Sequence, residues 1–131
     1  NWHWALPDEG SKAFTKSYGA EYGQPPSQSA HTGYVQALLY ADACERAGTF
    51  YPPEVIKALE DFEFDGLGNG PTLYRGADHQ CFKDVLVVRG NPNPTSKFDV
   101  LNIIGQASRD EVTYDPAMFG GELGPYDAKA C

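Results

Sequence analysis

The chain has 131 residues, of which 41% are hydrophobic and 13% aromatic, and this is enough apolar material for one folded domain. Acidic residues outnumber basic ones by 18 to 10, and the formal net charge of −8 argues against nucleic acid as a partner, because phosphate binding needs a basic surface. No apolar run approaches the roughly 20 residues that a membrane helix needs.

The first sixty residues have the apolar spacing and the boundary residues of three helices. The residues expected to cap or end the first two are Asp8 or Ser11, Gly23, Ser27 and Gly48. The second helix is the longer one and runs to about Ala47. A third helix starts at Pro52-Pro53-Glu54, because proline is favourable in a first turn. We expect its inward-facing residues to be Val55, Ile56, Leu59 and, at its far end, Phe62.

The second half of the chain is expected to form strands. A turn rich in glycine, from Asp65 to Pro71, precedes a short strand at residues 72–75. Residues 84–89 have the pattern of a buried strand and residues 98–107 that of another, joined by a surface turn at residues 91–94 into a hairpin. Residues 118–131 indicate an irregular tail.

The second helix carries small residues that permit another element to approach closely: Ala30, Gly33, Ala37, Ala41 and Ala43. Cys44 falls on a stripe with Tyr34, Ala37 and Ala41, which predicts a buried, unreactive thiol. No strands that would cover this stripe are evident in the sequence. Three helices followed by about three strands, without βαβ alternation, are a poor α/β domain when taken alone.

The sequence contains no convincing catalytic or metal-binding motif. The three histidines are scattered, and no pair of Cys and His has ligand spacing, so we expect no metal and no cofactor. The Gly66–Gly70 run lacks the helix that a phosphate loop needs behind it and is interpreted as a structural turn. Asp78 and His79 form the one candidate pair for a small hydrolase, but a self-satisfied polar turn explains them better without a nucleophile.

Most aromatic side chains fall in the first forty residues, and Trp2 and Trp4 are both near the N-terminus. Most of these residues are expected to form core. An aromatic wall with a few polar groups is also typical of a small-molecule pocket, and Ser29, His31 and Thr32 supply such groups at the start of the second helix.

Several short motifs, each weak alone, occur in an order that is specific over about 90 residues. They are Ser11–Phe14, Tyr22–Ser27, Gly33-Tyr34, Ala47-Gly48, Pro53–Leu59, Phe64–Gly70 and Arg75–Gln80. In this order they resemble the C-terminal part of type I periplasmic solute-binding proteins of ABC transporters, the group similar to branched-chain amino-acid binding proteins.

The resemblance implies a partial type I periplasmic-binding-protein fold of the α/β class. Such proteins close two lobes around a ligand, and the chain crosses the hinge between the lobes three times. On this reading residues 1–75 are the returning segment of the N-terminal lobe, and residues 76–131 are the final strands and tail of the C-terminal lobe. The first strands of both lobes have no counterpart, so we expect a truncated or processed chain that does not bind by itself.

The resemblance also implies a function and a set of ligand-binding residues. The family's wall residue falls at or near Ser29, with His31 beside it, and Trp2 and Trp4 are expected at the rim of the cleft. The chain is predicted to be an extracytoplasmic, non-catalytic component of an ABC importer that delivers an amino acid or an aromatic or organic acid to a permease. The alternative is an interaction fragment that forms a homodimer through its uncovered surface.

The three cysteines leave one pairing open. A bridge between Cys81 and Cys131 would tether the C-terminal tail and would require an oxidising compartment. Free thiols at both positions are the alternative.

Overall fold

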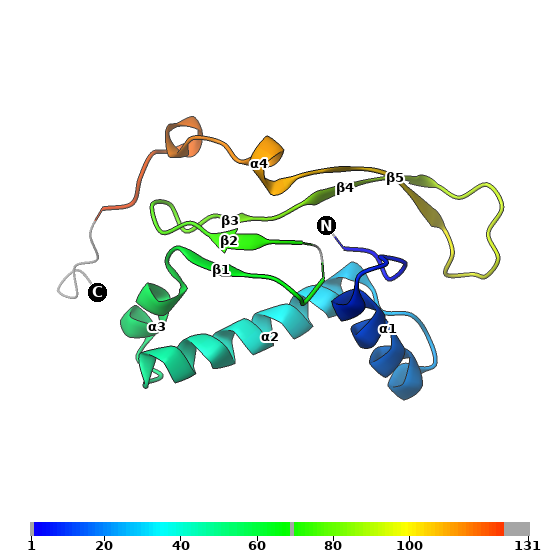
Figure 1. Cartoon of the computed structure of the whole chain (residues 1–131), viewed down its shortest axis with the longest axis horizontal. Coiled ribbons are helices and arrows are strands. Elements are labelled where there is room, and N and C mark those ends of the chain that lie inside the picture. The colour runs from blue at the N-terminus through cyan, green and yellow to red at the C-terminus, as the bar shows by residue number, and fades with distance from the viewer. Residues whose placement is uncertain (1, 69, 125–131) are drawn as a thin grey trace.

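The computed structural model of the chain describes residues 2–68 and 70–124. Three helices come first along the chain: α1 (Glu9–Tyr22), α2 (Gln28–Ala47) and α3 (Pro52–Leu59). They lie along one side of the molecule and the strands lie along the other (Figure 1). The predicted order of helices followed by strands is therefore confirmed, and with it the α/β class.

The helix ends follow from their capping residues. Asp8, rather than Ser11, caps α1, because its Oδ1 accepts a hydrogen bond of 2.8 Å from the backbone N–H of Ser11. Ser27 caps α2 in the same way. Gly23 and Gly48 end these two helices in the left-handed conformation, with φ of 66° and 65°, as the sequence predicts.

A small antiparallel sheet lies against the helices and has the strand order β1-β2-β3. Its strands are β1 (Phe62–Phe64), β2 (Thr72–Tyr74) and β3 (Cys81–Phe82). Only β2 is predicted from the sequence. The expectation that Phe62 extends the third helix is wrong, because α3 ends at Leu59 and Asp61 takes a positive φ of 55°, which turns the chain into β1.

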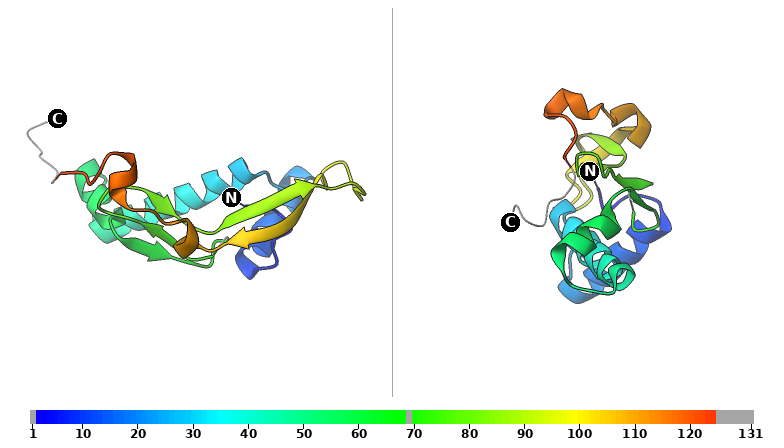
Figure 2. Two further views of the ribbon diagram at one scale, coloured as in Figure 1. Left: turned by 90° about the horizontal axis from the view of Figure 1, so that it is seen from above. Right: turned by 90° about the vertical axis from the view of Figure 1, so that its left-hand side faces the viewer.

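The strands β4 (Val85–Gly90) and β5 (Leu101–Ala107) form the predicted antiparallel hairpin, with a bulge between Val87 and Val88. The prediction that its first strand is buried is wrong, because Val87 is 48% exposed and Val88 41%. The reason is topological: the hairpin projects past the body as a two-stranded ribbon (Figure 2), and within the described residues no third strand pairs with it.

Two short helical turns follow the hairpin where the sequence pattern is weak: α4 (Arg109–Val112) and η1 (Pro116–Phe119). A capping box holds the start of α4, with Ser108 and Glu111 satisfying each other's backbone N–H. Its Ser-x-x-Glu signature is present in the sequence, but it precedes no apolar run and was not predicted.

The centre of the core lies between α2 and α3, where Ala43, Cys44 and Val55 are buried. The predicted burial of Cys44 is therefore confirmed. The stripe predicted for it is wrong, because Tyr34, Ala37 and Ala41 are all exposed. The helix buries the face that meets α3, whereas on the opposite face Tyr34 stacks on Phe14 of α1 and Leu38 and Ala41 remain exposed. Among the described residues, no helix combines the length and apolar character needed to cross a bilayer.

Candidate ligand-binding site

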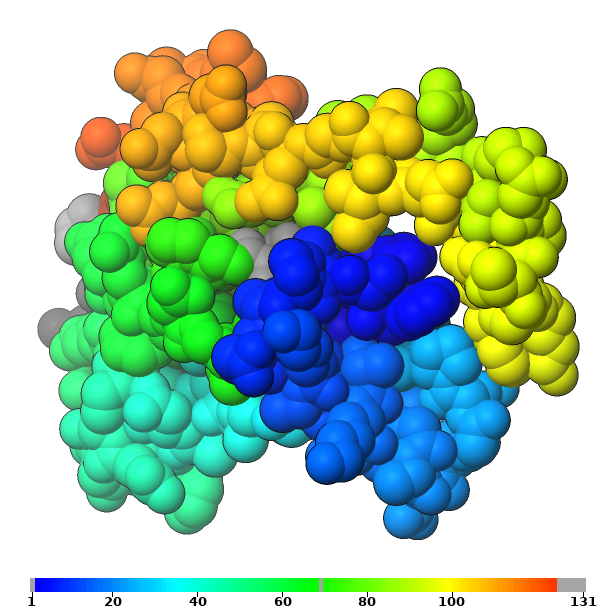
Figure 3. Space-filling view, turned by 45° about the vertical axis from the view of Figure 1, so that its right-hand side comes forward, coloured from blue at the N-terminus to red at the C-terminus, as the bar shows by residue number. Residues whose placement is uncertain are grey.

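A hollow of about 330 Å³ lies between the N-terminal segment, the linker from α1 to α2, and the β4–β5 hairpin. Figure 3 shows it between the dark-blue N-terminal segment and the yellow part of the hairpin. Most of its lining is apolar: Trp2, Trp4, Pro25, Pro26, Phe98, Val100 and Leu101. The polar groups in the lining come from His3, Ser27 and Gln28. This combination suits a small ligand that has an apolar ring and polar substituents.

Trp2 forms the fixed back wall of this hollow and is only 4% exposed. Its ring stacks on the imidazole of His31, with centroids 4.3 Å apart and planes at 6°. Its indole Nε1 donates a hydrogen bond of 2.9 Å to Ser11 Oγ. Because Ser11 and His31 are both buried, these contacts hold the indole in one orientation.

His31 links this wall to the turn between β1 and β2. Its Nε2 donates to the backbone carbonyl of Leu67 at 2.6 Å, which fixes the hydrogen of the neutral ring on Nε2. Burial lowers the pKa of His31 despite this hydrogen bond, so the neutral ring is favoured. The next residue, Gly68, has a φ of 92°, and a Cβ there would lie 2.6 Å from Ser11 Oγ. The Gly-rich turn thus serves a close approach, as its interpretation as a structural turn predicts.

Trp4 lies at the rim and is only partly buried. Its ring stacks on that of His3 at 5.3 Å, and its backbone carbonyl accepts a hydrogen bond of 3.3 Å from Thr15 Oγ1 on α1. Burial lowers the pKa of His3, and the Asp99 carboxylate opposes that effect. The N-terminal segment is therefore attached to α1 on one side and faces the hairpin on the other.

Of the four predicted ligand-binding residues, the structure brings together three. Trp2 and Trp4 line the hollow, and His31 lies directly behind Trp2. His31 also lines a separate cavity of about 230 Å³ between α2 and the small sheet. Ser29 is exposed on the first turn of α2 and lines neither cavity. Whether any of the four contacts a ligand stays a prediction.

Sequence reasoning missed the contribution of the hairpin to this hollow. Phe98, Val100 and Leu101 lie about 95 residues after Trp4 in the chain, and no local pattern connects them. Pro25 and Pro26 fall in the Tyr22–Ser27 motif between the first two predicted helices, and they also line the hollow. Their rigid, apolar rings at the wall were the one signal that the sequence offered.

The geometry of Asp78 and His79 gives no support to a hydrolase. Asp78 accepts two hydrogen bonds from the guanidinium of Arg75, at 2.8 and 2.6 Å, and these lower its pKa. His79 instead contacts Glu60 at 2.9 Å. The two side chains thus have different partners and do not form a dyad. No group of three or more His, Cys, Asp or Glu side chains is placed to hold a metal ion within residues 2–68 and 70–124.

The predicted disulfide bridge cannot be placed, because Cys131 lies outside the described residues. Cys81 is exposed in β3 and its thiol is next to the hydroxyl of Tyr74. The Cys81–Cys131 bridge therefore stays a prediction.

A family model described as periplasmic binding protein matches residues 1–96, so the chain belongs to the periplasmic binding protein family. The predicted resemblance is confirmed by this match. No curated protein matches the sequence.

Several solved structures share the fold. One is an amino acid ABC transporter substrate-binding protein from Pseudomonas fluorescens Pf-5, with a TM-score of 0.77, 19% identity, and coverage of 93% of this chain and 32% of that one. A branched-chain amino acid ABC transporter periplasmic ligand-binding protein from Burkholderia xenovorans LB400 has a TM-score of 0.72 and 22% identity, over 84% of this chain and 29% of that one.

A third similar structure is the solute binding protein of an ABC transporter from Rhodopseudomonas palustris BisB5, in complex with 3,4-dihydroxybenzoic acid. Its TM-score is 0.65 and its identity 20%, over 80% of this chain and 28% of that one. The chain therefore spans about a third of the length of these relatives.

Proposed function

We propose that the chain is part of the solute-binding component of an ABC importer, which closes two lobes around a small molecule and passes it to a permease without catalysis. Membership of the periplasmic binding protein family supports a solute-binding role and an extracytoplasmic location. The similar structures are substrate-binding proteins of ABC transporters rather than enzymes. That this chain itself catalyses nothing is part of the proposal.

The division into lobes also belongs to the proposal. Residues 1–75 are assigned to the N-terminal lobe and residues 76–131 to the C-terminal lobe. Strands β2 and β3 pair across this boundary, so on this assignment the small sheet lies at the hinge. Binding by the whole protein then includes a hinge motion biased by the ligand.

The hollow beside Trp2 and Trp4 is the observation that carries the ligand assignment. Its aromatic and proline walls suit a flat ring, and His3, Ser27 and Gln28 can bond to polar substituents. An aromatic acid fits these walls better than an aliphatic amino acid does, because ring stacking adds to the area buried. The complex of one relative with 3,4-dihydroxybenzoic acid supports this class of ligand.

Intrinsic fluorescence tests this assignment directly, because Trp2 and Trp4 are the only two tryptophans of the chain and both line the hollow. The sequence alone predicts a chain that does not bind by itself, but the hollow already provides one wall of a site. We therefore expect 3,4-dihydroxybenzoate to quench the emission saturably, and leucine to do so more weakly. Trp4→Phe leaves Trp2 as the single reporter, and free tryptophan at equal absorbance controls for light absorbed by the ligand. A Ser29→Ala variant that binds as tightly as the parent would remove Ser29 from the proposed site.

The same titration on a chain of the full length of its relatives measures how much of the binding depends on segments outside these 131 residues. We expect tighter binding there, because the second wall of a two-lobe cleft adds buried ligand area. Quenching by none of the amino acids or aromatic acids in either chain would overturn the proposal.

An interaction role is the second candidate, and the exposed face of α2 favours it. On this face Tyr34 is 40% exposed and Leu38, one turn further on, 41%. Apolar surface of this kind is a site of association, and a homodimer is its simplest form. Light scattering over a range of concentrations tests this, with Leu38→Glu expected to shift a dimer to monomer. A parent chain that is monomeric at every concentration would contradict it.

A further inference from the structure

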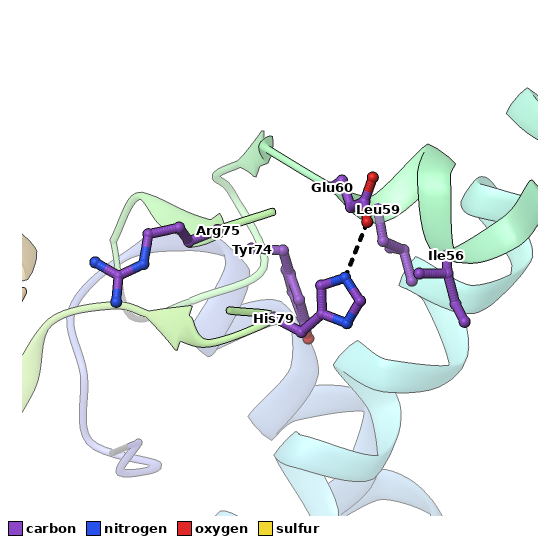
Figure 4. A pocket seen from close by; sticks show the side chains of 6 residues that line it. All are labelled: Ile56, Leu59, Glu60, Tyr74, Arg75 and His79. Carbon is purple, nitrogen blue, oxygen red and sulfur yellow. Dashed lines mark hydrogen bonds and ion pairs between the residues drawn. The ribbon is translucent and has the colours of Figure 1, made fainter. Parts of the chain in front are cut away.

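A cavity on the far side of the body from the tryptophan hollow lies between α3 and the turn that joins β2 to β3 (Figure 4). It holds about 210 Å³ and is lined by Ile56, Leu59, Glu60, Tyr74, Arg75 and His79. Its walls are mostly apolar, because Ile56, Leu59 and the ring of Tyr74 form most of them. Burial and the neighbouring Cys81 raise the pKa of Tyr74 to about 12, so its hydroxyl stays neutral.

The polar edge of this cavity is the pair formed by Glu60 and His79. The Nε2 of His79 donates to Oε1 of Glu60 at 2.9 Å, as the dashed line in Figure 4 shows. The other carboxylate oxygen, Oε2, accepts no hydrogen bond from any residue that the structure describes. One oxygen of a carboxylate next to an apolar wall is therefore available to a ligand.

The backbone around the cavity is strained on both sides. In the described part of the chain, Asp61 and His79 are the two non-glycine residues with a positive φ, and both have a φ of 55°. Asp61 Oδ1 accepts a hydrogen bond of 2.8 Å from the backbone N–H of Gly76, which ties the end of α3 to the β2–β3 turn. Such conformations cost energy and persist where surrounding contacts enforce them, often at binding sites.

The charges near the cavity favour a cation. Glu60 and Asp61 contribute two carboxylates, and Asp61 lines an adjoining hollow of about 660 Å³. The nearby cations are already paired: Lys57 with Glu54 at 3.2 Å, and Arg75 with Asp78. In Figure 4 the guanidinium of Arg75 points away from the other labelled side chains. Neither of these cations is paired with Glu60 or Asp61.

We propose that this cavity binds a small organic amine. The apolar part of the amine packs against Ile56, Leu59 and Tyr74, and its ammonium group donates a hydrogen bond to Oε2 of Glu60. This site shares no lining residue with the tryptophan hollow, so its test is independent of the transport function proposed above.

The direct test is a titration of the isotope-labelled 131-residue chain with 2-phenylethylamine, followed by amide NMR. The matched probe is 2-phenylethanol, which keeps the ring and the chain length but has no charge. We expect saturable shifts at Ile56, Leu59 and His79 with the amine, and about fivefold weaker binding of the alcohol, because a partly exposed ion pair contributes about that much. Equal binding of the two probes, or shifts that spread over the acidic surface without saturating, would overturn the proposal.

Two variants locate the contacts. Glu60→Gln should weaken the amine about fivefold and leave the alcohol unchanged, whereas Glu21→Gln, an equal change of charge on exposed α1, should change neither. Ile56→Ala should weaken the binding of both probes, because it removes part of the apolar wall. This variant still tests the cavity if Glu60→Gln does not fold. Amine binding that is unchanged by both Glu60→Gln and Ile56→Ala would show that the cavity is not the site.

Discussion

The body of the molecule, up to Phe82, and the hairpin β4–β5 that follows it are stabilised in different ways. Among the described residues, every buried apolar side chain belongs to the body: Trp2, Leu6, Pro26, Leu39, Ala43, Cys44, Val55 and Phe82. The hairpin and its loop bury no apolar side chain, and they expose five large ones: Val87, Val88, Val100, Leu101 and Ile104. A two-stranded ribbon is marginal in water on its own, so this hairpin requires a further surface to be stable.

The polar contacts of the body show how its elements are joined. The guanidinium of Arg46 on α2 bonds to the backbone carbonyl of Ala58 on α3 and lies 3.8 Å over the ring of Phe62 in β1. Arg75 joins β2 to the C-terminal segment through the carbonyl of Tyr114 at 2.5 Å. The hairpin loop has mainly local contacts, such as those of Asp99 with Thr95. The body is therefore expected to unfold as one unit and the hairpin to open separately.

Two glycines of α1, one closely packed and one loosely packed, should give the largest difference in stability when each is replaced by alanine. A Cβ on Gly10 would lie 2.1 Å from the carbonyl oxygen of Gly66, so Gly10→Ala should lower the free energy of unfolding by about 3 kcal/mol. At Gly19 the nearest atom is 3.9 Å away, and Gly19→Ala should raise the free energy of unfolding by about 0.5–1 kcal/mol. Urea unfolding of both variants measures the difference. A stable Gly10→Ala protein would contradict the contact between α1 and the Gly-rich turn.

A pair of identical substitutions compares the body with the hairpin directly. Val55 is 4% exposed in the core, and Val55→Ala should lower the free energy of unfolding by about 2 kcal/mol. Val87 is 48% exposed, and Val87→Ala should change it by less than about 0.5 kcal/mol. Thermal melts of both variants measure this difference. If the two substitutions lower the melting temperature equally, the hairpin is covered in solution, for example by a second copy of the chain.

The pH dependence of stability should also differ between the two parts. Burial lowers the pKa of His31 in the body, so the unfolded state binds its proton first as the pH falls. The stability that neutral His31 contributes is therefore complete above its ordinary pKa of 6.5 and is lost as the pH falls below it. His31→Gln should reduce the slope of stability against pH in this range. His3, whose pKa is also lowered, should keep part of the slope.

The hairpin loop should respond only in stronger acid. Hydrogen bonds from Thr95 lower the pKa of Asp99, so its contribution is complete above the ordinary value of 3.8 and is lost as the pH falls below that. Amide exchange of the loop and of α2 as a function of pH measures both effects in one experiment. Opening of the loop near pH 6, before the body loses stability, would contradict this assignment.

Much of the fold could be predicted from the sequence because its signals are local. The caps of α1 and α2, their left-handed glycines and the two prolines of α3 each act within one turn of their helix. The strands β1 and β3 could not be predicted, since they are only three and two residues long and exist through pairing with β2. The candidate site was predicted in part: Trp2 and Trp4 line a hollow, but Ser29 does not.

The sequence by itself determined the helices α1 to α3, the hairpin and, through the order of its motifs, the membership of the periplasmic binding protein family. Only the tertiary structure decided that Trp2 stacks on His31 and that Glu60 pairs with His79. It also decided which face of α2 is buried. Caps and turns depend on neighbours in the chain, whereas stacking, pairing and burial depend on residues that only folding brings together.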